Sequence, residues 1–475
     1  MELREVTVSG YRGVWGHTLT PDIGKAMANA YVKYTGAKKV AVGMDTRPSS
    51  PLLKAGVVEG LNIAGTTAID MGIVPTPTTC INAKDLKIPA IMITASHNLL
   101  KDKNDPLKNN HWNGLKFIGA DGLFLDEKKV NEFGKVFADV LSKGLVNAPV
   151  RGKLKAYKDP FDNHLGLILK NINADLIRER HFKVVLDAVN GAGSLITKIL
   201  LEKLGCTVIP LFTDIDAVAR TGDFPRGPEP TPQNLAELCR AVIKHKADLG
   251  VAQDPDADRL SFVDENGLAI GEENTLAIAV FHILSKYGQE AKKVVINQST
   301  TRAIDDISEK FGVKVVRTKI GEINVTSKMI ELGSMIGGEG NGGVIFPPVC
   351  FNRDSLSGTA LLLEEMAESG SSLSQIVSSF PRYYMRKAKS GELASKKAAA
   401  SAVKEMCELY KSERLDFTDG IKVIFDADGS WVHVRASNTE SIIRIIAEAS
   451  TQEAADKLVE DTAKKLKIKL VNEKE

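Results

Sequence analysis

The sequence predicts an α/β protein in which three successive α/β domains with mixed sheets precede a C-terminal α+β domain. The chain has 475 residues, and at roughly 100–200 residues per domain this length corresponds to about three or four domains. Up to residue 317, short apolar runs alternate with helix-length segments, as in α/β layers. After residue 395, strand-like runs follow one another closely between two helical segments, which is typical of a small α+β module.

The first domain is expected at residues 1–155 and the second at residues 156–264, with a basic, irregular stretch at 151–159 where they meet. The strands expected in these domains lie at residues 40–43, 67–69, 88–93, 183–187, 207–209 and 247–252. The helices expected in the second domain lie at residues 194–204 and 235–246. Two of these strands end directly before polar motifs, and the edge where strands end is where α/β proteins place their sites.

The third domain is expected at residues 265–385 and the fourth at residues 386–475. In the third, helices at 273–286 and 301–311 alternate with strands at 293–297 and 313–317. In the fourth, helices at 395–411 and 453–466 enclose strands at 422–425, 431–434 and 442–447.

The composition favours a cytoplasmic protein with reduced cysteines over a secreted or nucleic-acid-binding protein. Hydrophobic residues make up 43% and charged residues 26% of the chain, and the net charge is only +2. Such a balance argues against a nucleic-acid partner. The five cysteines are scattered without a C-x-x-C pair, and no signal-like or membrane-spanning apolar run occurs. We therefore expect a cytoplasmic protein without a membrane or nucleic-acid partner; no feature of the sequence sets an oligomeric state.

Three aspartates alternate at the end of a predicted strand. Asp254, Asp256 and Asp258 follow the apolar run at 249–252, and hard oxygen ligands at this spacing suit Mg²⁺. A polar turn is the alternative interpretation. An EF-hand is excluded because Arg259 stands where that loop needs glycine, and the following residues predict a strand.

Ser96 follows another predicted strand within the motif T-A-S-H-N. A serine at this edge can act as a nucleophile or cap a helix, and the residues alone leave both open. A Ser-His-Asp hydrolase is disfavoured, since no G-x-S-x-G elbow is present and adjacent side chains such as His97 rarely face each other.

Two further segments can bind ligands. The glycine-dense stretch 337–343 surrounds Glu339 and Asn341, and glycines allow a ligand to approach the backbone closely. The stretch 435–439 offers guanidinium, hydroxyl and amide groups that can wrap a phosphate. A flexible turn and a solvated polar loop remain the respective alternatives.

Together these motifs make the chain resemble the α-D-phosphohexomutase superfamily over nearly its whole length. The serine motif T-A-S-H-N is intact, the metal motif D-G-D-x-D-R occurs at 254–259, and G-E-x-S-G occurs at 338–342. The phosphate motif R-x-S-G-T-E-P occurs at 435–441, and N-G-x-K occurs at 113–116. The chain departs from these patterns at Pro255, Asn341 and Asn438, and a longer polar segment at 99–112 replaces the usual proline after the serine motif.

The resemblance implies a mutase whose four domains surround a central cleft. It implies that Ser96 carries a phosphoryl group, that one Mg²⁺ per chain is held by Ser96, Asp254, Asp256 and Asp258, and that a hexose bisphosphate is the activator. The catalytic residues that it implies are Ser96, Arg12, Lys116 and Arg259. The residues implied to bind the sugar are Glu339, Asn341 and Glu322. Those implied to bind the non-reacting phosphate are Arg435, Ser437, Asn438, Thr439 and Arg444. Closure by a hinge near Ser390 is also expected.

The implied reaction interconverts hexose 6-phosphate and hexose 1-phosphate through an enzyme-bound bisphosphate. Relatives of this kind act on glucose, mannose, glucosamine or N-acetylglucosamine phosphates. Glu322 stands where phosphoglucosamine mutases usually carry an acid, so glucosamine phosphate is favoured. The alternatives are a phosphoglucomutase/phosphomannomutase, a non-catalytic sugar-phosphate sensor on the same fold, and a phosphatase.

Overall fold

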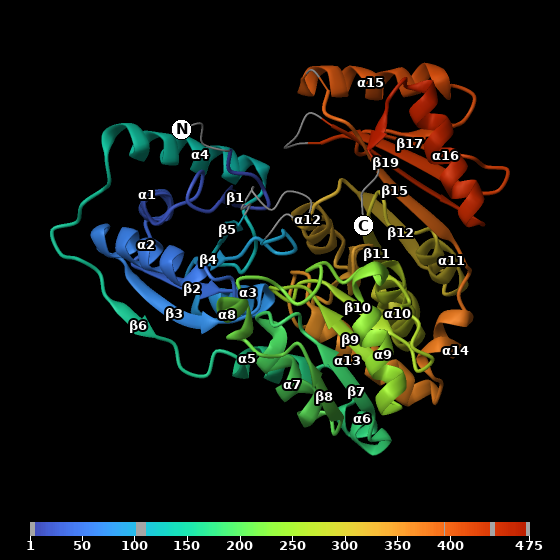
Figure 1. Cartoon of the computed structure of the whole chain (residues 1–475), viewed down its shortest axis with the longest axis horizontal. Coiled ribbons are helices and arrows are strands. Elements are labelled where there is room, and N and C mark those ends of the chain that lie inside the picture. Colours follow the sequence, from blue (N-terminus) through green and yellow to red (C-terminus); the bar gives the residue numbers. More distant parts are fainter. Residues whose placement is uncertain (1–4, 101–110, 394, 438–441, 472–475) are drawn as a thin grey trace. The chain divides into compact units, whose positions relative to one another are not determined.

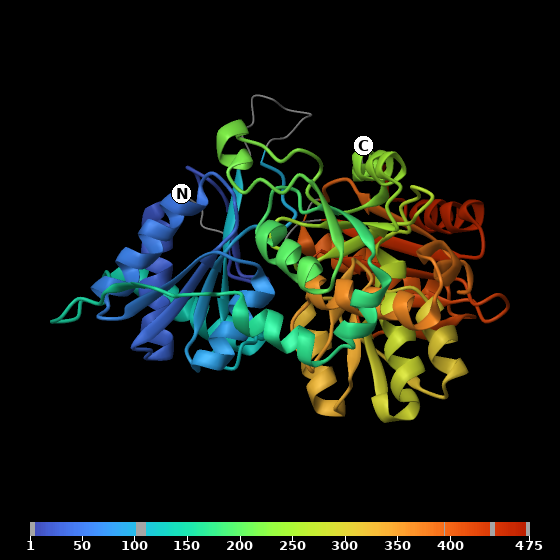
Figure 2. The same cartoon turned by 90° about the horizontal axis from the view of Figure 1, so that it is seen from below.

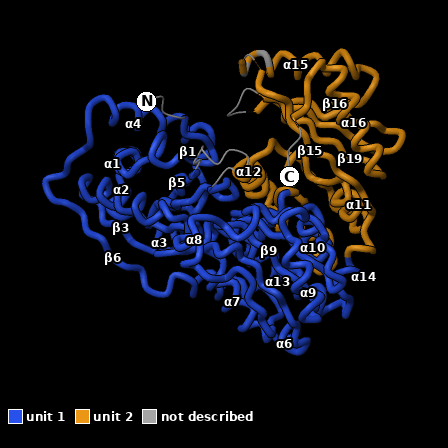
Figure 3. The backbone as a smooth tube through the Cα atoms, viewed as in Figure 1, with its two compact units in different colours: residues 1–282, 341–376 blue, residues 283–340, 377–475 orange. Residues whose placement is uncertain are grey.

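The computed structural model describes residues 5–100, 111–393, 395–437 and 442–471. The chain forms two compact units, each assembled from two stretches of sequence (Figure 3). Unit 1 comprises Met1–His282 with Asn341–Ile376, and unit 2 comprises Ile283–Gly340 with Val377–Glu475. In the part of the chain that is described, no helix has the length and apolar character needed to cross a bilayer.

The first sheet of unit 1 is mixed. Its strands, in spatial order, are β1 (Tyr11–Val14), β5 (Trp112–Ile118), β4 (Ala90–Ile93), β2 (Lys39–Met44), β3 (Thr67–Ile73) and β6 (Leu154–Ala156). Strand β5 runs antiparallel to β1 and β4, and the other pairs are parallel. Four helices accompany it: α1 (Pro21–Thr35), α2 (Ser50–Ile63), α3 (Thr76–Leu86) and α4 (Glu127–Lys143).

Helices cover both faces of this sheet (Figure 2). One core contains apolar side chains of α1, α2 and α4, such as Tyr31, Val57 and Phe133, packed on the strands. A second core contains Cys80 and Ala83 of α3 with Met92. Because both faces are buried, β4 is apolar along its length and β2 is apolar after its first residue, the exposed Lys39, as expected of parallel strands.

The second sheet of unit 1 has the order β10 (Leu260–Val263), β9 (Leu249–Gln253), β7 (Lys183–Asp187) and β8 (Thr207–Leu211). Strand β10 is antiparallel to β9, and the others are parallel. Its helices are α5 (Asp162–Lys170), α6 (Ala174–Arg180), α7 (Gly193–Lys203), α8 (Ala217–Thr221), η1 (Pro232–Asn234) and α9 (Ala236–His245). The aspartate motif occupies the short loop between β9 and β10.

Unit 1 ends with a returning segment that comes after the glycine-dense stretch. It contains β14 (Gly343–Ile345) and α13 (Ser355–Ser369). Two helices, α10 (Glu272–Tyr287) and α14 (Leu373–Ser378), continue from unit 1 into unit 2. Asp354 caps α13 by accepting hydrogen bonds from the backbone amides of Leu356 and Ser357.

Unit 2 begins with a parallel arrangement in which β11 (Lys293–Asn297) lies between β12 (Lys314–Thr318) and β13 (Ile336–Glu339). The connecting elements are η2 (Gly288–Ala291), α11 (Ala303–Lys310) and α12 (Glu322–Leu332). Gly337 of β13 has no room for a side chain, since a Cβ would lie 2.3 Å from the carbonyl oxygen of Val295.

The C-terminal sheet of unit 2 is antiparallel. Its order is β16 (Arg414–Asp416), β17 (Ile421–Ile424), β18 (Trp431–Ala436), β19 (Ile443–Ala449), β15 (Tyr384–Ser390) and β20 (Leu470–Val471). Helices α15 (Lys396–Leu409) and α16 (Gln452–Lys465) share one core with this sheet (Figure 1). The predicted α/β class with a C-terminal α+β module is therefore confirmed.

Several local expectations are corrected. Strands β1 and β5 were not predicted from the pattern, and the stretch expected to be irregular contains β6. Much of the glycine-dense stretch is strand, because β13 includes Gly337, Gly338 and Glu339. Ser390, near which a hinge is expected, is the last residue of β15, where it is buried and its hydroxyl accepts a hydrogen bond from the amide of Ile443.

Candidate active site

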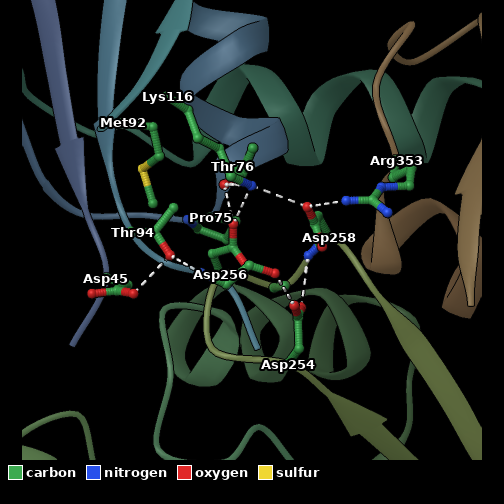
Figure 4. A network of polar contacts seen from close by, with 12 residues as sticks. Asp45, Pro75, Thr76, Met92, Thr94, Lys116, Asp254, Asp256, Asp258 and Arg353 are labelled. Atoms are coloured by element: carbon green, nitrogen blue, oxygen red, sulfur yellow. Dashed lines mark hydrogen bonds and ion pairs between the residues drawn. The ribbon is translucent and has the colours of Figure 1, made fainter. Parts of the chain in front are cut away.

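The three aspartates of the β9–β10 loop form a compact, buried acidic cluster. Each offers a carboxylate oxygen, and these oxygens lie within 4.8 Å of one another. All three side chains are fully buried. Figure 4 shows Lys116 and Arg353 beside them. Such a concentration of buried negative charge needs cations to be stable.

Each carboxylate uses its two oxygens differently. One oxygen of Asp256 accepts hydrogen bonds from Lys116 and Thr76, and one oxygen of Asp258 accepts from Lys116 and Arg353. The other oxygen, Oδ1 of both Asp256 and Asp258, is buried with no hydrogen-bond partner among the described residues. Asp254 accepts from the backbone amides of Asp258 and Arg259 through one oxygen and from Ser96 through the other. Unpartnered buried acceptors are costly, so this donor set fits a divalent cation.

The charges within the cluster pull the carboxylate pKa values in opposite directions. Burial, followed by the charges of Asp258 and Asp256, raises the pKa of Asp254 well above its usual value. Burial also disfavours ionisation of Asp258, but the charges of Arg353, Lys116 and Arg259 outweigh it and lower the pKa of that carboxyl. These three basic side chains therefore keep part of the cluster ionised.

Ser96 lies just beyond β4, with its hydroxyl aimed at the acidic cluster. Its Oγ is 2.9 Å from Asp254 Oδ2. The residue has a φ of 49°, an unfavourable left-handed conformation. The Thr94 hydroxyl holds this shape by accepting a hydrogen bond from the Ser96 amide and donating one to Asp45. The predicted nucleophile and metal ligands, 158 residues apart in sequence, are thus brought together.

His97 does face Ser96, contrary to the expectation for neighbouring side chains. Its Nδ1 lies 3.3 Å from Ser96 Oγ. Burial, followed by the charges of Arg259 and Arg12, lowers the pKa of His97 well below its usual value. His97 is therefore a neutral hydrogen-bond partner of the serine.

Arg47 and Asp45 stabilise the serine loop and were missed as functional residues. Arg47 is fully buried, pairs with Asp45 and donates to the carbonyl oxygens of Ser96, Asn98 and Trp112. Arginine can satisfy several acceptors at once through its planar fork of donors. The available signal was the polar run directly after the strand at 40–43, the same signal that marks Ser96.

Three predicted cationic residues surround the acidic cluster. Lys116 of β5 has its Nζ 2.6 Å from Asp256 and 3.1 Å from Asp258. Arg12 of β1 donates to Asn98, and Arg259 pairs with Glu229, yet each keeps a buried Nε without a hydrogen-bond partner among the described residues. Burial lowers the pKa of Arg12 to about 10, although the charge of Asp256 opposes this. Unpartnered guanidinium donors beside an acidic cluster suit a phosphoryl group.

The predicted sugar-binding residues are split between the units. Glu339 ends β13 in unit 2, and its Oε1 accepts hydrogen bonds from Asn297 Nδ2 at 3.0 Å and from the Gly321 amide at 2.9 Å. Glu322 opens α12 directly after Gly321, which has a φ of 121°. Asn341 belongs to unit 1, and its Oδ1 is buried without a hydrogen-bond partner among the described residues.

The predicted phosphate-binding residues that the structure describes lie on two neighbouring strands of the C-terminal sheet, β18 and β19, or, for Ser437, directly after β18. Arg435 of β18 stands opposite Arg444 of β19. Burial lowers the pKa of Arg435, with Asp419 opposing and Arg444 adding to the shift. The Nε of Arg435 is buried and unpartnered within the described residues. The amide of Ser437 donates to the Ile442 carbonyl, and Asn438 and Thr439 lie outside the described residues.

The comparisons with known proteins agree with this arrangement. Four models of the phosphoglucomutase/phosphomannomutase family match in order: α/β/α domain I at residues 4–142, domain II at 162–267, domain III at 272–384 and the C-terminal domain at 386–465. A phosphoglucomutase/phosphomannomutase of Thermococcus kodakarensis is 37% identical, over 98% of this chain and 97% of the relative. A protein of Methanopyrus kandleri, named a probable phosphoglucosamine mutase, is 34% identical over 95% of both chains.

A solved structure of similar fold comes from Burkholderia thailandensis. This phosphoglucomutase/phosphomannomutase family protein superposes with a TM-score of 0.81 at 24% identity, covering 99% of this chain and 100% of that one. The full-length matches, together with the ordered motifs, establish the family. The chain belongs to the phosphoglucomutase/phosphomannomutase family of α-D-phosphohexomutases.

Proposed function

We propose that this protein interconverts hexose 6-phosphate and hexose 1-phosphate through a phosphorylated Ser96 and an enzyme-bound hexose bisphosphate, with glucosamine phosphate as its preferred substrate. One observation carries the proposal. The Ser96 hydroxyl lies 2.9 Å from Asp254, in a cluster where Asp256 and Asp258 each present a buried, unpartnered oxygen. A nucleophile and a set of cation ligands at one point are what phosphoryl transfer requires.

Asp254, Asp256 and Asp258 would hold one Mg²⁺, together with an oxygen of the phosphoryl group on Ser96. The ion would draw negative charge from the transferring phosphoryl group. One oxygen of each aspartate is already held by a hydrogen bond from a donor of the protein. The carboxylates therefore need little reorganisation when the ligand arrives.

Arg12, Arg259 and Lys116 would contact the transferring phosphoryl group. With a pKa of about 10, Arg12 stays charged near neutral pH and serves to bind and orient. Lys116 is the better proton carrier, because a lysine amine loses its proton more readily than a guanidinium group does. In this role the neutral amine of Lys116 would take the proton of the attacking sugar hydroxyl, and the resulting ammonium would later return a proton to the departing sugar oxygen.

Unit 2, together with Asn341 of unit 1, would supply recognition. Glu339 would bind sugar hydroxyls, since its orientation is set by Asn297 and Gly321, and Asn341 would add an amide. The groups proposed to hold the non-reacting phosphate are Arg435, Ser437, Asn438, Thr439 and Arg444. Binding energy at this remote phosphate positions the hydroxyl that reacts. The bisphosphate must turn over so that its other phosphate returns to Ser96, and a hexose bisphosphate would recharge any dephosphorylated enzyme.

The choice of glucosamine phosphate rests on Glu322. A carboxylate at the first position of α12 can attract the ammonium group of glucosamine. The names of the relatives include both phosphoglucomutase/phosphomannomutase and phosphoglucosamine mutase. Because these relatives are named for different sugars, the preference for glucosamine phosphate is tested by comparing turnover of the three sugar phosphates.

The deciding experiment is a mutase assay with Mg²⁺ and a trace of hexose bisphosphate. Glucosamine 6-phosphate, glucose 1-phosphate and mannose 1-phosphate are supplied in parallel to the wild-type protein and to Ser96→Ala. We expect isomerisation, fastest with glucosamine phosphate, that Ser96→Ala abolishes. Release of inorganic phosphate in place of isomer would indicate a phosphatase, and binding without turnover by a phosphorylated protein would indicate a sensor.

A further inference from the structure

We propose that Arg353 and Ser355 are positioning residues that hold the metal-binding loop, residues 254–258, in the shape that receives the cation. This inference rests on the proposed function, because it concerns the same acidic cluster. Neither residue belongs to the motifs that mark the site in the sequence. Both lie on the returning segment of unit 1, at and just before the start of α13.

The loop needs external support because one of its residues has an unfavourable backbone. Ala257, between two of the aspartates, is fully buried and has a φ of 52°. A residue with a Cβ rarely adopts this left-handed conformation. Such a conformation persists only where the surroundings enforce it.

Ser355 supplies one such constraint on Ala257. Its Oγ donates a hydrogen bond of 2.6 Å to the Ala257 carbonyl oxygen. The same Oγ accepts from Gln253 Nε2 at 2.7 Å. Because Gln253 donates to a lone pair of Ser355 Oγ, the hydroxyl proton of Ser355 is free to point at the Ala257 carbonyl oxygen.

Arg353 supplies a second constraint, on the last aspartate. Its Nη2 lies 2.7 Å from Asp258 Oδ2. Lys116 contacts the same oxygen at 3.1 Å, and Oδ1 is left buried without a hydrogen-bond partner among the described residues. Arg353 thus fixes the rotation of the carboxylate and leaves Oδ1 for the cation.

The segment that carries both residues is itself firmly held. Asp354, between them, accepts from the amides of Leu356 at 3.0 Å and Ser357 at 3.2 Å. His164 of α5 lies 3.0 Å from the Asp354 carboxylate, and its other ring nitrogen contacts Thr78 of α3 at 2.9 Å. The start of α13 is therefore a rigid support for the loop, as the groups behind metal ligands usually are.

Positioning and simple charge compensation predict opposite effects when Arg353 is removed. If Arg353 only balanced charge, its loss would leave a more negative cluster that binds a cation more tightly. If Arg353 fixes the carboxylate, its loss frees the Asp258 side chain and weakens cation binding. Ser355 is neutral, so its removal tests positioning without any change of charge.

The test is Mn²⁺ binding to the full-length protein, measured from the free Mn²⁺ signal by electron paramagnetic resonance. We expect Arg353→Met and Ser355→Ala each to weaken Mn²⁺ binding by roughly 10–100-fold, and Arg353→Lys to weaken it less. In the mutase assay, the Mg²⁺ concentration for half-maximal activity is expected to rise by a similar factor, while KM for the sugar phosphate changes little.

Matched controls separate this effect from general damage. Arg151→Met removes an exposed arginine that pairs with Glu59, and Ser142→Ala removes an exposed hydroxyl that donates to a carbonyl. Both are expected to bind Mn²⁺ as the wild type does. If Arg353→Met does not fold, Ser355→Ala decides alone.

The outcomes also distinguish this inference from the proposed function. Equal or tighter Mn²⁺ binding by a folded Arg353→Met, or unchanged binding by Ser355→Ala, overturns the positioning role while the metal site stands. Wild-type protein that binds no Mn²⁺, or binding that Asp256→Asn does not reduce, overturns both. Weakened binding in both variants with unchanged controls supports the inference.

Discussion

Two buried histidines, His282 in unit 1 and His433 in unit 2, differ in the charges that surround them. In unit 1, the ring nitrogens of His282 each lie 2.9 Å from a glutamate, Glu364 or Glu365. Burial opposes protonation of His282, but these hydrogen bonds and charges outweigh it and raise its pKa to about 9. Burial by itself therefore does not decide the state of a histidine.

In unit 2, His433 is equally buried but stays neutral. Burial lowers its pKa to about 4; the carbonyl and charge of Asp419 oppose this shift, and the charges of Lys422 and Arg435 add to it. Its Nδ1 contacts the Ser299 hydroxyl at 2.8 Å. Lys422 is buried too, with its Nζ 3.7 Å from the centre of the Trp431 ring.

The candidate site repeats this contrast. Among the described residues, unit 1 has spare carboxylate oxygens on Asp256 and Asp258 beside the spare guanidinium donors of Arg12 and Arg259, whereas unit 2 has a spare guanidinium donor on Arg435. Spare acceptors suit a cation and spare donors suit an anion. The division of labour that we propose, with metal-assisted transfer in unit 1 and phosphate recognition in unit 2, follows from this difference.

The largest expected effect comes from neutralising one aspartate of the acidic cluster in unit 1. Asp256→Asn removes the charge of a proposed metal ligand, and because a bound metal contributes several kcal/mol to the transition state, we expect kcat to fall by about a thousandfold or more. Asp264→Asn is the matched control, since Asp264 is buried beyond β10 and its Oδ1 accepts hydrogen bonds from the turn amides of Asn266 and Leu268. Steady-state kinetics would contradict the assignment if Asp256→Asn retained a tenth of the wild-type activity.

The two histidines are expected to give opposite stability profiles, each on the order of 3 kcal/mol for a shift of about 2.5 pKa units. Because the folded pKa of His282 is raised from 6.5 to about 9, its contribution is full below pH 6.5 and is lost as pH rises through 9. For His433, lowered from 6.5 to about 4, the contribution is full above pH 6.5 and is lost as pH falls through 4.

Urea unfolding of His282→Gln and His433→Gln beside the wild type, from pH 4 to 10, measures both profiles. The free energy of unfolding that His282→Gln loses relative to the wild type should shrink towards high pH. The loss for His433→Gln should shrink towards low pH. Losses of unfolding free energy that change with pH in the same direction for both variants would contradict the contrast between His282 and His433.

A smaller effect is expected from removing an arginine of the proposed phosphate site in unit 2. Arg435→Met removes a charged donor from the proposed phosphate site, and hydrogen bonds to charged groups contribute about 1.5–3 kcal/mol, so kcat/KM should fall by roughly 10–100-fold. Mn²⁺ binding to unit 1 should not change. Arg386→Met, on β15 of the same sheet, removes a partly exposed arginine paired with Asp456 and serves as the control.

The smallest effect concerns sugar choice. Glu322→Ala should lower kcat/KM for glucosamine 6-phosphate by roughly fivefold, as a partly screened ion pair contributes about 1 kcal/mol. Glucose 1-phosphate, which has no ammonium group, should be affected little. Equal change with glucosamine, glucose and mannose phosphates would remove Glu322 from the recognition of the substrate.

Much of the candidate site can be predicted from sequence because its residues lie in short motifs at strand ends. Ser96 follows β4 and the aspartates follow β9, so apolar runs ending in unusual polar groups reveal them. Strand β5 was hidden because its buried residues include Asn113 and Lys116, which interrupt the apolar pattern. Strand β6 was hidden because its three residues are exposed, so nothing in the pattern distinguishes it from a loop.

The sequence by itself therefore determined the class of fold, the order of the modules and the place of the aspartate motif at a strand end, since each depends on local patterning, and it predicts Ser96 as the nucleophile. Only the tertiary structure decided how these groups are held. Arg47 contacts Ser96 from 49 residues away, and Arg353 contacts Asp258 from 95 residues away. The charges around His282 and His433 likewise come from segments distant in sequence. Contacts of this range depend on how the elements pack, and no local pattern encodes them.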